Sequence, residues 1–153
     1  METQEEITNE SFFLFLGVLA GVIVAAVLAP WDDYFLANFM FYWIPQAVIL
    51  GVLMSVSSRP AAVAGTAIIL AFYLAAYWAW LHHVKSDDAG LAWLGYLFSL
   101  PGAAVGALFG ASFIERKKYK YAKVACLILA ASTLVGLALN QLLICSTVMY
   151  CRL

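Results

Sequence analysis

The side chains best suited to metal chemistry lie in the breaks between long apolar runs. Imidazole and carboxylate groups together can bind a divalent cation, and the chain carries them as two histidines and two pairs of aspartates: Asp32, Asp33, His82, His83, Asp87 and Asp88. Adjacent residues of a helix point in different directions, so both histidines reach one ion only from a loop. We therefore expect hydrated loop residues here and no metal site.

The apolar runs themselves contain no group that commonly carries catalysis. They hold no Asp, Glu, His, Lys or Arg except at their ends. They also hold no nucleophile paired with a base and no His-Glu metal motif. Without histidines inside the runs, a haem or quinone site is not expected. We predict that the chain is not an enzyme and that it uses no cofactor.

Uncharged polar side chains do occur within the runs. Four of them are candidates for a polar cavity: Gln46, Ser99, Asn140 and Gln141. Pro45 and Pro101 are the expected sites of a broken helix, where freed carbonyl groups can line such a cavity. The alternative is that these amides and hydroxyls bond from one helix to another.

Two of the three cysteines, Cys145 and Cys151, flank a short polar segment near the end of the chain. If the helix ends before Cys151, this segment can turn back and bring the two Cα atoms within the roughly 4.4–6.8 Å that a disulfide needs. The orientation derived below places the pair on the oxidising side of the membrane and Cys126 on the reducing side. We predict that the pair can form a disulfide while Cys126 stays free; two unpaired cysteines are the alternative.

Composition defines the environment that must position these residues. Of the 153 residues, 65% are hydrophobic and 11% are charged, and the mean hydropathy is +0.93. A soluble domain is about a quarter charged, so these charges are too few to coat a water-facing surface. The runs are continuously apolar, unlike the alternating strands of a membrane β-barrel. The net charge of −1 gives no reason to expect nucleic acid as a partner.

Five runs have roughly the 20 apolar residues that cross a hydrocarbon core. We predict an all-α fold, a polytopic helical membrane bundle in one domain, 1–153, with about five transmembrane helices. Four would remain if the aromatic stretch 35–43 lies along the interface. An acidic tail, 1–11, lacks the basic residues of a signal peptide, and an outer tail covers 145–153. The predicted spans are 12–29, 36–56, 60–81, 91–114 and 123–144.

Basic residues set the predicted orientation. Five of the eight lie between the last two spans: Arg116, Lys117, Lys118, Lys120 and Lys123. The positive-inside rule places this 115–123 loop in the cytoplasm, and one crossing then puts the C-terminus outside. The same side chains are candidates for contact with lipid headgroups, although a loop that only fixes topology is the simpler interpretation. We expect the cytoplasmic (inner) membrane of a bacterium.

Small residues recur every four positions in the runs. Gly102, Gly106 and Gly110 form such a series in the fourth span, and Gly17 and Gly21 repeat the spacing in the first. These faces let helix backbones approach closely, because packing drives association in lipid. They are candidates for packing within the bundle, or for a face that meets a partner protein or a second copy.

Aromatic side chains gather near the ends of the spans. Trp31, Tyr34, Tyr42, Tyr96 and Tyr121 are examples. We interpret them as the belt of Trp and Tyr that lies at both membrane–water interfaces.

These patterns predict a non-enzymatic membrane protein that acts by association with another protein in the bilayer. It would be an accessory subunit of a membrane complex or an immunity protein against a membrane-inserting toxin. The alternative is a small oligomeric channel or transporter for a neutral solute or an ion. A polar cavity at Gln46 and Pro101 would favour the transporter, whereas a dry bundle with an exposed glycine face would favour the partner-binding protein.

Overall fold

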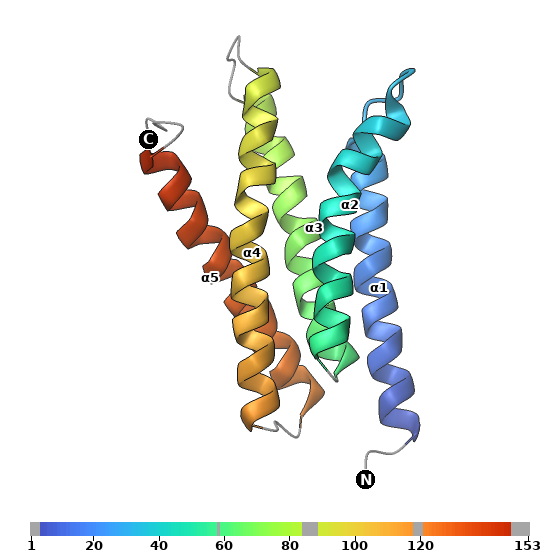
Figure 1. The fold of residues 1–153 in the computed structure, drawn as a ribbon. Coiled ribbons are helices and arrows are strands. Elements are labelled where there is room, and N and C mark those ends of the chain that lie inside the picture. Colours follow the sequence, from blue (N-terminus) through green and yellow to red (C-terminus); the bar gives the residue numbers. More distant parts are fainter. Residues whose placement is uncertain (1–3, 58, 84–88, 118–120, 148–153) are drawn as a thin grey trace.

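The computed structural model describes residues 4–57, 59–83, 89–117 and 121–147, which form five helices and no strand (Figure 1). Each helix is long and apolar enough to cross a membrane. The predicted all-α membrane bundle with five spans is therefore confirmed. The helices are α1 (Gln4–Leu28), α2 (Phe35–Val56), α3 (Pro60–His83), α4 (Ala89–Lys117) and α5 (Ala122–Thr147).

The helices run alternately up and down, and α3 lies at the centre of the bundle (Figure 1). It contacts the four other helices, with α1 and α5 packed most extensively against it, while α4 pairs with α5. Residues 61–67 of α3 are all buried. Most of them are alanine or glycine, and small side chains let neighbouring backbones approach on every side.

The prolines inside α2 and α4 do not break their helices, contrary to the expectation at Pro45 and Pro101. A proline removes one backbone donor and disturbs the preceding turn. In both helices a side chain donates to a carbonyl of that turn: Tyr96 to Tyr42 O in α2, and Asn140 to Phe98 O in α4. The aromatic stretch 35–43 is part of α2 and is not a separate element.

The acidic tail predicted at 1–11 is largely helical, because α1 begins at Gln4. Glu10 is buried, and its Oε1 lies 3.2 Å from a guanidinium nitrogen of Arg59. The Ala61 N–H at the start of α3 donates to Glu10 Oε2 at 3.4 Å. Neutralisation of its charge by Arg59 and this hydrogen bond allow Glu10 to lie at the end of a span.

At the other end of the chain, α5 continues to Thr147, so Cys145 is helical and does not belong to a tail.

Candidate functional site

The buried polar side chains between α2 and α4 bond to each other. Gln46 Nε2 donates to the Tyr96 hydroxyl at 2.9 Å and to the Tyr42 carbonyl at 3.2 Å. The Tyr96 hydroxyl donates to the same carbonyl at 3.2 Å. The rings extend the contact, since Tyr42 lies 4.8 Å from Trp93 and Tyr77 lies 6.0 Å from Tyr96 between centroids. Gln46 therefore lies in a packed, hydrogen-bonded cluster.

A second polar group connects α3, α4 and α5. Ser99 Oγ and the Tyr73 hydroxyl both bond Gln141 Oε1, and Gln141 Nε2 lies 3.7 Å from Cys145 Sγ. Thr66 of α3 and Thr133 of α5 bond to each other at 3.0 Å. Within the described chain, every buried side-chain N or O atom has a hydrogen-bond partner.

The four residues predicted to line a polar cavity do not face one common space. Gln46 lies in the α2–α4 cluster, Ser99 and Gln141 lie in the α4–α5 group, and Asn140 lies on the outer side of that pair. Cross-helix bonding, the alternative considered from the sequence, accounts for their arrangement. Tyr42 and Tyr96 are also buried in these contacts. Their assignment to the interfacial belt is wrong, because their hydroxyl and carbonyl partners lie inside the bundle.

The glycine series in α4 packs against α5. A Cβ on Gly102, Gly106 or Gly110 would come within 3 Å of atoms of Asn140, Gly136 or Ser132. Gly136 of α5 lies opposite this series, because a Cβ added to it would meet the backbone of Gly102 and Gly106. These glycines therefore lie in a contact within the chain.

The two glycines of α1 also lie against neighbouring helices. A Cβ on Gly17 would be 3.2 Å from Ala67 Cβ of α3, and one on Gly21 would be 2.7 Å from Trp43 Cζ3 of α2. Neither glycine offers its small surface to a partner.

Asn140 is a polar side chain at the surface of the α4–α5 pair. Its amide Nδ2 donates to Phe98 O at 2.6 Å, and the side chain is partly exposed. It lies in a notch of about 250 Å³ between the two helices, lined by Pro101, Gly102, Val105, Gly136, Leu139 and Leu143. An asparagine amide can make further bonds through its oxygen and its second N–H. A polar group in a shallow, small-residue notch is a candidate contact for another transmembrane helix.

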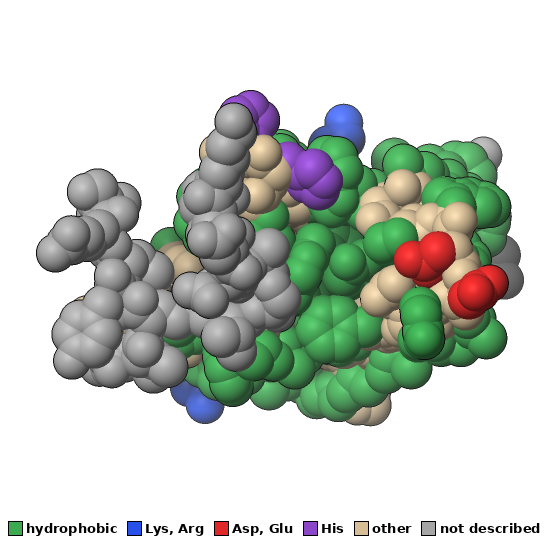
Figure 2. All heavy atoms as spheres, turned by 90° about the horizontal axis from the view of Figure 1, so that it is seen from above, with side chains coloured by type: hydrophobic (Ala, Val, Ile, Leu, Met, Phe, Trp, Pro, Cys, Tyr) green, Lys and Arg blue, Asp and Glu red, His purple; other side chains and the backbone are tan. Residues whose placement is uncertain are grey.

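Charged side chains divide between the two ends of the bundle. The four described basic residues, Arg59, Arg116, Lys117 and Lys123, lie at one end, which we call the basic end. Figure 2 looks onto the opposite end, where acidic and histidine side chains lie apart, with hydrophobic surface between them. His82 and His83 bond backbone carbonyls of their own helix, and no group of three potential metal ligands is found among the described residues. Asp87, Asp88, Lys118 and Lys120 lie outside the described residues.

The cysteines differ in their bonding. Cys126 has a free thiol, and Cys145 is disulfide-bonded. Cys151, the partner expected from the sequence, lies outside the described residues, so that pairing stays a prediction.

Comparison of the chain with protein-family models, with curated proteins and with solved structures finds no match. Sequence reasoning missed the pairing of Glu10 with Arg59 and the exposure of Asn140. The first had a signal, an acidic residue directly before an apolar run, but the second depends on which side of α5 meets α4.

Proposed function

We propose that this protein acts by binding another membrane protein through the α4–α5 notch, with Asn140 at the centre of the contact. The observation that carries the proposal is the depth of this amide. Asn140 lies six residues from the middle of the Ala122–Ser146 span, which is about 9 Å along the helix. Because the hydrocarbon core extends about 15 Å from its midplane, the amide faces lipid tails that offer it no hydrogen bond.

A partner helix would supply the hydrogen bonds that lipid tails cannot offer to this amide. Interhelical bonds from asparagine favour association in lipid. Gly102 and Gly136 flank Asn140 in the notch. The surface thus offers a polar group that fixes the register of a partner helix, and this requires no catalytic residue. Such a surface suits an accessory subunit of a membrane complex or an immunity protein against a membrane-inserting toxin.

The channel or transporter alternative has less support. Its pathway would need polar groups that solutes or ions can reach, yet Gln46, Ser99 and Gln141 are engaged with neighbouring side chains. Glycine lets α4 pack directly on α5, and the alanines and glycine of α3 let its neighbours pack closely on it.

We also propose an orientation in the inner membrane of a bacterium. The basic end holds Arg59, Arg116, Lys117 and Lys123, and Asp32 and Asp33 lie at the other end. The positive-inside rule then places the basic end in the cytoplasm.

Site-specific photo-crosslinking tests the contact in native membranes. A photoreactive residue at Leu143, within the notch, should give an adduct with a second protein. The same residue at Leu134 should not, because nine residues are two and a half helical turns and place Leu134 on the opposite side of α5. Both leucines are exposed in the isolated chain.

Two matched variants test whether the crosslinked adduct at Leu143 depends on the amide of Asn140. Asn140→Leu should abolish the Leu143 adduct, whereas Asn38→Leu, a like exchange on α2, should leave it intact. Thermal unfolding of each purified variant checks that the bundle is preserved. Adducts with lipid alone, or an adduct that survives Asn140→Leu, would refute the proposal. A product of twice 16.7 kDa would identify a second copy of the chain and overturn the assignment to a different protein.

A further inference from the structure

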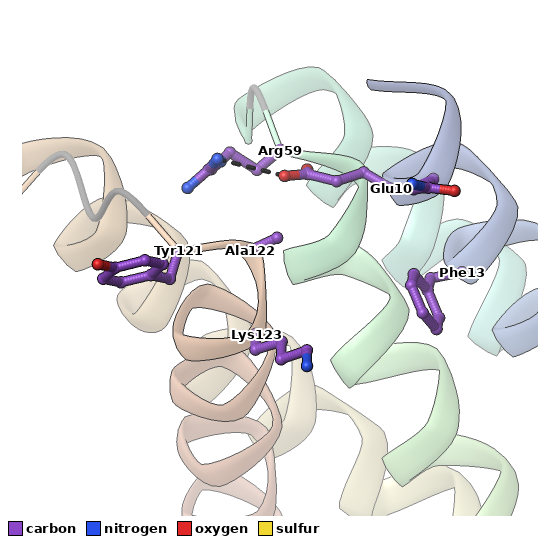
Figure 3. A pocket seen from close by; sticks show the side chains of 7 residues that line it. Glu10, Phe13, Arg59, Tyr121, Ala122 and Lys123 are labelled. Atoms are coloured by element: carbon purple, nitrogen blue, oxygen red, sulfur yellow. Dashed lines mark ion pairs between the residues drawn. The ribbon is translucent and has the colours of Figure 1, made fainter. Parts of the chain in front are cut away.

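The basic end carries a polar pocket between α1, α3 and α5 that is separate from the Asn140 notch. Its volume is about 330 Å³, and its lining includes Glu10 of α1, Arg59 before α3, and Tyr121 and Lys123 at the start of α5. Figure 3 shows Arg59 directed to Glu10 across the top of the pocket, with Lys123 and Phe13 on either side of α3.

Among the described residues that line the pocket, two are basic and one is acidic, which leaves one positive charge in excess. Arg59 is paired with Glu10 at 3.2 Å, and that carboxylate also accepts the Ala61 N–H. Lys123 has no ion-pair partner among the described residues. The N-termini of α3 and α5 adjoin the same pocket, and their partial positive charges have the same sign as the excess. A group with a single negative charge complements this arrangement.

An apolar groove of about 360 Å³ continues from the pocket into the membrane-spanning part of the bundle. The two spaces share Phe13, Ala122 and Lys123. The floor of the groove is α3, and its apolar walls come from α1 and α5 on either side.

The groove has the shape that an extended hydrocarbon chain requires. Its floor consists of Ala61, Ala64 and Ile68 on one side of α3, and the seven helical steps from Ala61 to Ile68 span about 10 Å. Cys126 and Leu127 of α5 line one wall. The small alanines make the floor deep, while Phe13 and Leu127 project at the rim, both more than half exposed.

We propose that the pocket and the groove together bind one anionic glycerophospholipid. Its phosphodiester would lie between Arg59 and Lys123, and one acyl chain would lie along α3 beneath Phe13. A free phosphate could use the basic residues, but it would leave the groove empty. A zwitterionic lipid would add an ammonium group to a pocket whose only described carboxylate is already paired with Arg59.

Protection of Cys126 measures occupancy of the groove directly. The purified protein in neutral detergent is alkylated with a maleimide while a lipid is titrated in, and the modified Cys126 peptide is quantified by mass spectrometry. Phosphatidylglycerol should slow alkylation at an at least fivefold lower concentration than phosphatidylcholine, the factor that one charge near a charged surface contributes. Inorganic phosphate should give no protection. Native mass spectrometry should show one retained lipid per chain.

Two variants that each remove one positive charge distinguish a specific lipid site from general electrostatic attraction of lipid to the basic end. Lys123→Gln should weaken protection by phosphatidylglycerol at least fivefold, because Lys123 lines both spaces. Lys117→Gln removes the same charge from the same end but lies outside the pocket, and should change protection less than twofold. Equal losses in the two variants, equal protection by the two lipids, or protection by inorganic phosphate would overturn the proposal. None of these results depends on a protein partner at Asn140.

Discussion

Replacing Gly106 with alanine tests whether α4 and α5 are held together by direct contact of their backbones. A Cβ on Gly106 would lie 3.0 Å from the Cα of Gly136 and closer still to the carbonyl oxygen of Ser132. Both are backbone atoms, which cannot rotate away as the end of a side chain can. The two helices must therefore move apart, and overpacking of this kind typically costs about 1–3 kcal/mol. The backbone partners place the expected loss in the upper part of that range.

Gly51 of α2 supplies a matched control, because a Cβ added there meets nothing within 4 Å. Both exchanges alter helix propensity by the same amount, about 1 kcal/mol, so the difference between the variants isolates the steric cost. We expect Gly106→Ala to be less stable than Gly51→Ala by about 2–3 kcal/mol. The assay is unfolding in mixed micelles titrated with dodecyl sulfate, followed by tryptophan fluorescence and circular dichroism. Equal stability of the two variants would refute the packing argument.

Three further predictions concern the charges and the thiols. Arg59→Gln leaves a buried carboxylate without its partner and should lower the free energy of unfolding by about 3–5 kcal/mol. Adding Glu10→Gln should restore much of that loss, and simple additivity of the two changes would show that the pair is not coupled. Peptide mass spectrometry after alkylation should find Cys126 modified before reduction and Cys145 only after it; modification of Cys145 in unreduced protein would contradict the bond. A cysteine in place of Arg116 should react with a membrane-impermeant reagent in inverted vesicles only, and labelling in intact cells would reverse the proposed orientation.

The five helices could be predicted because each apolar run is long enough to cross the bilayer without help from its neighbours. The ends of the helices were harder to place. Residue 12 was the expected start of the first span because Glu10 carries a charge, but Arg59, forty-nine positions later, neutralises it. A pairing between residues so far apart depends on tertiary packing, which one sequence does not reveal. Cys145 was assigned to a tail for a similar reason, since only the fold shows α5 continuing to Thr147.

The candidate sites were predictable as residue types but not as neighbours. Gln46, Ser99 and Asn140 can be recognised in the sequence as polar residues within the spans, yet their bonds follow from the rotation of each helix about its axis. A polar cavity and hydrogen bonds between helices use the same amide side chains, so the composition of the spans could not distinguish these two interpretations. The glycine spacing in α4 predicted a close contact, but it did not indicate whether the opposing backbone belongs to α5 or to another protein.

The central position of α3 has a consequence for how the protein is made. Helices leave the ribosome in order, and α3 is built largely from alanine and glycine around residues 61–67, all of which are buried in the finished bundle. When α3 first enters the bilayer, α1 and α2 can cover part of it, but the side that meets α5 still faces lipid or the insertion machinery. That side includes Gly65, whose Cβ position lies against the backbone of Cys126. Membrane insertion of this chain is therefore expected to pass through a three-helix stage with an open groove, closed when the α4–α5 hairpin arrives. Chains cut between α3 and α4 and synthesised as two pieces should still find each other along this groove.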